Sequence, residues 1–201
     1  MSEVAICNQA LSWLGESPIT SLDDPTKAAA LCKANYAELR DAVLEESDWT
    51  FAKKRRSLPA SATAPAYGYG KAYPLPGECL HVLSVNEIRQ GDPRGAWIVE
   101  DREILTNDSS CRVIYIKRLT DTGKFSSLFK QALAARLAAE LAIPLTASRS
   151  LQAQHFQLYE EKRSKAAGRD GQQGKSKRIR SRWMENARIS SGPRNTAGPE
   201  V

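Results

Sequence analysis

Hydrophobic residues recur every three or four positions in four stretches of the chain, which is the spacing of one face of a helix. These apolar stripes begin at Val4, Ala28, Phe125 and Leu151. Gly15, Pro144 and Gly168 follow three of the stripes and predict helix ends there. The second stripe reaches about Glu46, and the aromatic residues Trp49 and Phe51 follow it and are expected to pack across the end of that helix.

Between the second and third stripes the pattern changes to short runs rich in β-branched residues. The runs over 79–118 are "CLHVLSVNEI", "AWIVE", "EILT" and "CRVIYIKR", and turn-forming residues separate them. Asp101 and Arg102 lie between two runs and predict a tight hairpin. We expect a small antiparallel sheet of three to four strands here, preceded by a loop over 57–70, which is rich in Pro, Ala, Ser and Gly.

Together these elements predict a mainly α fold. Residues 1–56 and 120–168 are expected to form a four-helix bundle-like body. Residues 57–119 are expected to form a loop and a small antiparallel β insertion. Residues 169–201 lack apolar periodicity and are predicted to be an extended, basic C-terminal arm.

Two adjacent carboxylates precede the second helix. Asp23 and Asp24 come just before Pro25, in the stretch "ITSLDDPTKAAALC". A carboxylate at a helix start accepts hydrogen bonds from free backbone N–H groups, and proline suits the first helical turn. A catalytic or metal-binding pair would need a further ligand or base, and none is near in the sequence. We therefore interpret Asp23 and Asp24 as helix-capping residues.

The charge of the chain is unevenly distributed. The 201 residues carry a net charge of +6, yet residues 162–201 contain 11 Lys and Arg against three acids. The strongest cluster consists of Lys175, Lys177, Arg178, Arg180, Arg182 and Trp183. Basic residues beside an aromatic anchor suit either nucleic-acid phosphates or an acidic groove on a protein. A solvated, solubilising tail is the third interpretation.

A second basic cluster follows the second helix. Lys53, Lys54, Arg55 and Arg56 form the run "KKRR". Such a run is typical of a solvated turn. The alternatives are a contact with an acidic neighbour or with nucleic acid.

The sequence gives no support for catalysis. Cys7, Cys32, Cys79 and Cys111 are far apart and are expected to be buried free thiols. His81 and His155 are isolated, and no catalytic, metal or dinucleotide pattern occurs, so we predict no enzyme and no cofactor. An enzyme would need a positioned acid such as Glu45, Glu46 or Asp48. No apolar run is long enough to span a bilayer, and the first residues lack the basic region of a secretion signal.

The order of several motifs resembles a known family. The chain opens with "ALSWLG", "ITSLDD" and "TKAA", continues with "RDAVLEESDWTFAKKR" and "YPLPGECLHVL", and later contains "LFKQALAARLAAELAIPLTAS". In this order and spacing they resemble the head-to-tail adaptor proteins of tailed bacteriophages, the family that includes tail tubular protein A. The resemblance covers roughly residues 3–183.

The resemblance implies a structural role in the virion. Such adaptors form a ring, typically of twelve copies, below the portal protein at the capsid vertex. The ring binds a downstream tail or nozzle protein, and DNA passes through its lumen. It implies assembly in the bacterial host cytoplasm and no membrane contact. The basic arm lies where a portal-docking segment would be. The alternative function is a nucleic-acid-binding protein that uses its basic tail on the phosphate backbone.

Overall fold

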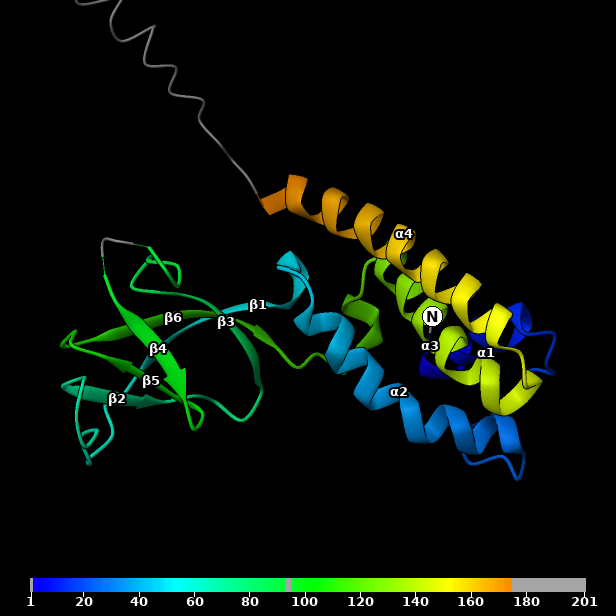
Figure 1. The fold of residues 1–201 in the computed structure, drawn as a ribbon, viewed down its shortest axis with the longest axis horizontal. Coiled ribbons are helices and arrows are strands. Elements are labelled where there is room, and N and C mark those ends of the chain that lie inside the picture. The colour runs from blue at the N-terminus through cyan, green and yellow to red at the C-terminus, as the bar shows by residue number, and fades with distance from the viewer. Residues whose placement is uncertain (1, 93–94, 175–201) are drawn as a thin grey trace, which may run out of the picture.

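The computed structural model describes residues 2–92 and 95–174 and shows an α+β fold. Its helices are α1 (Glu3–Trp13), α2 (Lys27–Glu45), α3 (Ser127–Thr146) and α4 (Arg149–Gly174). Two short 3₁₀ helices, η1 (Thr50–Ala52) and η2 (Thr122–Lys124), lie at the two passages between helices and strands. The helices gather on one side of the molecule and the strands on the other (Figure 1).

The strands form two antiparallel sheets of three strands each. The first sheet contains β1 (Lys53–Leu58), β6 (Cys111–Lys117) and β3 (Cys79–Val85), in that spatial order. The second sheet contains β2 (Lys71–Pro74), β5 (Glu103–Thr106) and β4 (Trp97–Glu100), in that order. Strand β1 therefore forms one edge of the first sheet, and β4 forms one edge of the second.

The prediction of a mainly α, four-helix bundle-like fold is wrong. The four helices are present, but six strands in two sheets lie beside them. The β part is therefore a second major part of the fold rather than a small insertion. The four runs over 79–118 do form strands. The prediction missed β1 and β2, because "KKRRSL" has charged residues where a strand pattern expects apolar ones, and "KAYP" is very short.

Helix α3 occupies the centre of the helical part. Its alanines, including Ala134, Ala135 and Ala138, are fully buried, because α1, α2 and α4 all pack against it. Alanine side chains allow helices to approach closely while still burying apolar surface. Trp49 packs edge-to-face on Phe129 with ring centroids 5.0 Å apart, and its indole N–H donates to the Val43 carbonyl. The predicted packing of Trp49 across the end of α2 is confirmed.

Two predicted helix ends are wrong. Pro144 does not end α3, which continues to Thr146. Proline gives up one N–H bond and favours a helix end before it without enforcing one. Here the last turn is held by the Thr146 hydroxyl, which donates to the Ala142 carbonyl, and by the Ala147 N–H, which donates to the Ile143 carbonyl. Ala147 then ends α3 in a left-handed conformation. Gly168 does not end α4 either, because the helix continues for six more residues and Asp170 holds its last turns against the body.

A second apolar core lies between the two sheets. Val113 and Tyr115 of β6 face Tyr73, Trp97 and Ile104 of the second sheet. The hairpin between β4 and β5 turns at Asp101 and Arg102, both with positive φ angles, which is the backbone form that two-residue hairpins require. The predicted tight hairpin at this position is confirmed. None of the helices in the described ranges is both long and apolar enough to cross a membrane.

Candidate functional site

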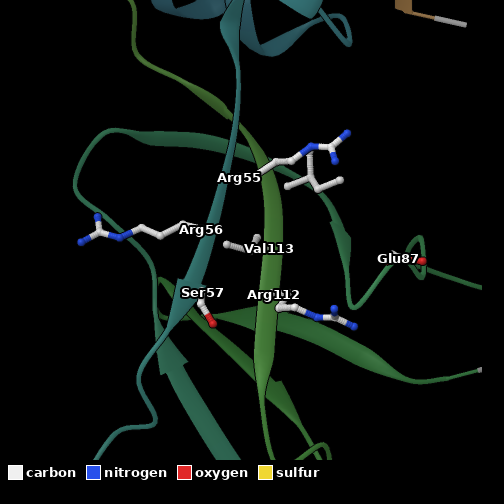
Figure 2. Close-up of a pocket in the computed structure, with 7 residues that line it drawn as sticks. Arg55, Arg56, Ser57, Glu87, Arg112 and Val113 are labelled. Atoms are coloured by element: carbon white, nitrogen blue, oxygen red, sulfur yellow. The ribbon is translucent and has the colours of Figure 1, made fainter.

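The basic run "KKRR" lies in β1, not in a turn. The strand pairs only with β6, so its other edge carries no strand in the part of the chain that the structure describes. Lys53 to Ser57 are all exposed. Figure 2 shows Arg55 and Arg56 pointing to opposite sides of the strand, as neighbours in a strand do.

Lys54 makes the contact with an acidic neighbour that was one of the predicted alternatives. Its ammonium group lies 2.6 Å from the Glu78 carboxylate, which also accepts a hydrogen bond from the Tyr115 hydroxyl. The hydrogen bond from Lys54 makes the largest contribution to holding the pKa of Glu78 below its ordinary value, and the hydrogen bond from Tyr115 makes the next largest. The Lys54 charge is therefore already matched within the chain.

The remaining cations of β1 line a groove. Within the described residues, Lys53, Arg55 and Arg56 have no ion pair. Two hollows of about 340 and 410 Å³ lie next to each other, with Arg55 and Ile114 lining both, and we call the two together the basic groove. Arg112 lines one end and Lys53 the other.

The strand register explains why Arg55 and Arg112 share a face. Arg55 lies opposite Ile114, and Ser57 lies opposite Arg112, and directly paired residues project to the same side of a sheet. This side faces away from the second sheet, because Val113 and Tyr115 alternate with Arg112 and Ile114 and point into the core between the sheets. Figure 2 shows Arg55 and Arg112 on the same side of the two strands.

Two acids moderate the charge of the basic groove. Asp48 pairs with Arg89 at 3.1 Å, and Glu87 lines the groove near Arg112. Arg55 and Arg112 remain without an ion-pair partner in the described ranges. Guanidinium groups form paired hydrogen bonds with carboxylates and phosphates. The groove is therefore suited to an anionic ligand or an acidic protein surface.

The predicted portal-docking arm lies outside the described residues. Lys175, Lys177, Arg178, Arg180, Arg182 and Trp183 all follow Gly174, where α4 ends. Residues 169–174, which were predicted to begin the extended arm, form the last turns of α4 instead. From here on we use the name basic arm for residues 175–201, and the structure shows only the base to which this arm is attached.

That base is fixed to the body by a buried aspartate. Asp170 is 6% exposed, and its carboxylate accepts hydrogen bonds from the Thr50 backbone N–H and the Thr50 hydroxyl, both at 2.6 Å. About one turn earlier Ala166 is buried, and about three turns earlier Tyr159 donates its hydroxyl to Glu46. Burial and this hydrogen bond raise the pKa of Tyr159. Helix α4 is thus anchored to within four residues of the basic arm.

Asp23 and Asp24 do not cap α2, so the helix-cap prediction is wrong in its residues. Thr26 is the N-cap, and its hydroxyl accepts from the Ala29 N–H. The Asp24 carboxylate instead accepts from the backbone N–H groups of Ser21 and Thr20, which lower its pKa. Asp23 forms an exposed ion pair with Lys33. Pro25 lies before the N-cap residue, and the N-cap is two to three residues later in the chain than predicted.

The described residues bring no catalytic constellation together. All four cysteines are buried free thiols, as predicted. His81 is exposed on β3, and His155 stacks on Trp13. No group of three metal-ligating side chains occurs within the ranges that the structure covers. Among the acids considered for an enzyme, Glu46 bonds Tyr159 and Asp48 pairs with Arg89.

Sequence reasoning missed two of the residues that define these sites. Arg112 belongs to the basic groove only through the pairing of β1 with β6, and β1 was not predicted. Asp170 was assigned to an extended arm. Its signal was the helical spacing of Tyr159, Ala166 and Asp170, which places all three on one face of α4.

The comparisons with known proteins add no family. The chain matches no family model, and a search of curated proteins finds no match.

Proposed function

We propose that this chain is a structural virion protein that joins the phage head to the tail. In this function a ring of copies binds below the portal protein, extends the DNA channel and receives a downstream tail or nozzle protein. The observation that carries the proposal is the order of sequence motifs over residues 3–183, which resembles that of head-to-tail adaptors.

The base of the basic arm supports this proposal. Helix α4 is 26 residues long and is anchored through Asp170, so it presents the following segment from a fixed point on the body. That segment contains seven Lys and Arg against two Glu between Lys175 and Val201. An arm of this charge suits an acidic groove on a portal subunit. Many arms in one ring would bind together, so a modest affinity for each arm suffices.

The division of the molecule also supports it. A ring subunit must contact its neighbours, the portal above and the tail below, and these contacts need separate surfaces. The helical part and the two-sheet part offer such surfaces at opposite ends of the molecule (Figure 1). The basic groove lies on the two-sheet part, far along the chain from the arm.

Sedimentation velocity with the portal ring of the same phage tests this function. Full-length protein should join the portal as a large stoichiometric complex, whereas a chain ending at Gly174 should not. This end point keeps Asp170 and its bonds to Thr50, so the variant loses the arm without losing the anchor. A matched control replaces only the five cations of the cluster Lys175–Arg182 by glutamine. Full-length protein that ignores the portal would refute the proposal.

The unpaired arginines of the basic groove favour a second candidate function, binding to the phosphate backbone of nucleic acid. Binding of this kind weakens steeply as salt rises, because each neutralised phosphate releases a counterion. A short duplex titrated between about 50 and 200 mM salt should then lose about a thousandfold in affinity if six or more phosphates are contacted. Binding to duplex DNA without any binding to the portal would favour this alternative.

A further inference from the structure

The basic groove has the features of an interface that is incomplete in a single chain. Arg55 and Arg112 project from one face of β1 and β6, and neither has an ion-pair partner among the residues described. Ile114 lies between them, half-buried on the groove floor. Two unpaired guanidinium groups around an apolar floor resemble the centre of a protein interface, where Arg is enriched.

The same molecule carries a surface of complementary chemistry on its second sheet. A hollow of about 500 Å³ lies between the β4–β5 hairpin and the loop 61–69. Glu100, Asp101 and Glu103 line it, together with Tyr67 and Tyr69. We call this surface the acidic hollow. Carboxylates beside tyrosine rings can hold a guanidinium group by ion pairing and by stacking.

The charges of the acidic hollow are not matched within the described chain. Glu100 lies directly opposite Glu103 in the strand register, an arrangement that repels across a hairpin. Arg102, the one cation of the turn, donates instead to the carbonyl groups of Pro76 and Cys79. Tyr67 is 89% exposed, which is unusual for so large an aromatic side chain. The repulsion would be relieved by a cationic partner.

A single molecule cannot join its own basic groove to its own acidic hollow. Glu100 and Glu103 lie on the outer face of the second sheet, because Trp97 and Ile104 alternate with them and fill the core between the sheets. Arg55 and Arg112 lie on the outer face of the first sheet. The two surfaces therefore face away from each other, with the core between them.

We propose that the acidic hollow of one copy docks on the basic groove of the next copy, with Arg55 and Arg112 entering among Glu100, Asp101 and Glu103. The contact joins two different surfaces, so it is heterologous and repeats around a ring or along a filament. This inference rests on the proposed function, in which the copies form a ring. It assigns that ring a contact between sheets in addition to any packing of helices.

Charge exchange tests the contact. The groove variant carries Arg55→Glu and Arg112→Glu, and the hollow variant carries Glu100→Arg and Glu103→Arg. A matched control carries Lys165→Glu and Arg169→Glu, two exposed positions on α4, with the same change in net charge as the groove variant. Circular dichroism melts establish that each variant folds. Assembly is then measured by sedimentation velocity, alone and on the portal ring.

Each variant alone should need at least about tenfold more protein for half-assembly, because like charges then meet at the contact. The control should assemble as the wild type does. An equimolar mixture of the two variants should recover assembly, since each groove then meets a hollow of opposite charge. A single chain carrying all four substitutions should recover it as well.

Several outcomes would overturn this contact. Unchanged assembly of the groove variant would do so, as would loss in both variants without recovery in the mixture or in the fourfold variant. A groove variant that assembles normally but no longer shifts duplex DNA would make the groove a nucleic-acid site. Wild-type rings on the portal would still support the adaptor function in each case. Charge-exchange recovery without any portal binding would support the contact and contradict the function.

Discussion

At the scale of single residues, Asp170 is the side chain on which the position of α4 most depends. Asp170→Ala leaves the Thr50 N–H and hydroxyl without their acceptors, so the free energy of unfolding should fall by about 2–3 kcal/mol. Urea denaturation followed by tryptophan fluorescence measures this, because Trp49 is buried beside Thr50. Arg169→Ala, an exposed neighbour, should stay within about 0.5 kcal/mol of the wild type. Equal behaviour of the two variants would contradict the anchoring role.

The buried thiols of the two-sheet part predict how stability depends on pH. Burial raises the pKa of Cys79 to about 11, and it does the same for Cys111. In the unfolded chain both thiols titrate near the ordinary cysteine value, so above that value the unfolded state loses protons that the folded state keeps. Stability should therefore be full below about pH 9 and fall as the pH rises toward about 11.

Unfolding of the wild type and of a Cys79→Ala, Cys111→Ala variant at a series of pH values checks this prediction. The variant loses some packing at every pH, so the comparison concerns the slope rather than the absolute free energy. Its stability should decline less steeply above pH 9 than that of the wild type. Parallel curves over this range would show that the two thiols do not contribute to the alkaline loss of stability.

At the scale of elements, the start of α2 allows a comparison between Thr26, which caps the helix, and Asp23, an acid close to it that does not. Thr26→Ala removes the side-chain acceptor for the Ala29 N–H, and the free energy of unfolding should fall by about 1 kcal/mol. Asp23→Ala removes only an exposed ion pair with Lys33 and should cost less than about 0.5 kcal/mol. Thermal unfolding of both variants decides between them. A larger loss for Asp23→Ala would restore the cap that the sequence first suggested.

The sequence predicts elements well wherever apolar periodicity decides them. The four helices, the strands over 79–118 and the Asp101–Arg102 turn all follow from local pattern and turn chemistry. Strand β1 could not be predicted in this way, because an exposed edge strand carries charged residues on both sides and has no apolar alternation. The continuation of α4 past Gly168 was missed for a related reason: Asp170 is held by Thr50, 120 residues away in the chain.

The candidate site could also be predicted only in part, because its residues are far apart in the chain. The run "KKRR" is plain in the sequence, but its partner Arg112 joins it only through the pairing of β1 with β6. Likewise the carboxylates of Glu100 and Glu103 become opposite neighbours only in the hairpin. Local pattern identifies charged residues, whereas strand register decides which of them act together.

At the scale of the whole molecule, the two cores are joined through the first sheet. Ile116 of β6 belongs to the helical core, while its neighbour Tyr115 belongs to the core between the sheets. Arg118, just after β6, pairs with Asp41 of α2 at 2.6 Å. The sheets are thus attached to the helices by packing and by charge.

The anchoring of α4 through Asp170 predicts that the body and the arm are separable at Gly174 but not at Gly168. A chain ending at Gly174 keeps every described contact of α4, so its free energy of unfolding should match that of the full chain within about 0.5 kcal/mol. A chain ending at Gly168 loses Asp170 and both bonds to Thr50, and it should lose roughly 1–3 kcal/mol. Urea denaturation of the three chains under one set of conditions measures the difference.

If the Gly168 chain is as stable as the other two, the last turns of α4 are not part of the folded body. Loss of portal binding in the Gly174 chain could then no longer be assigned to an arm that begins at Lys175.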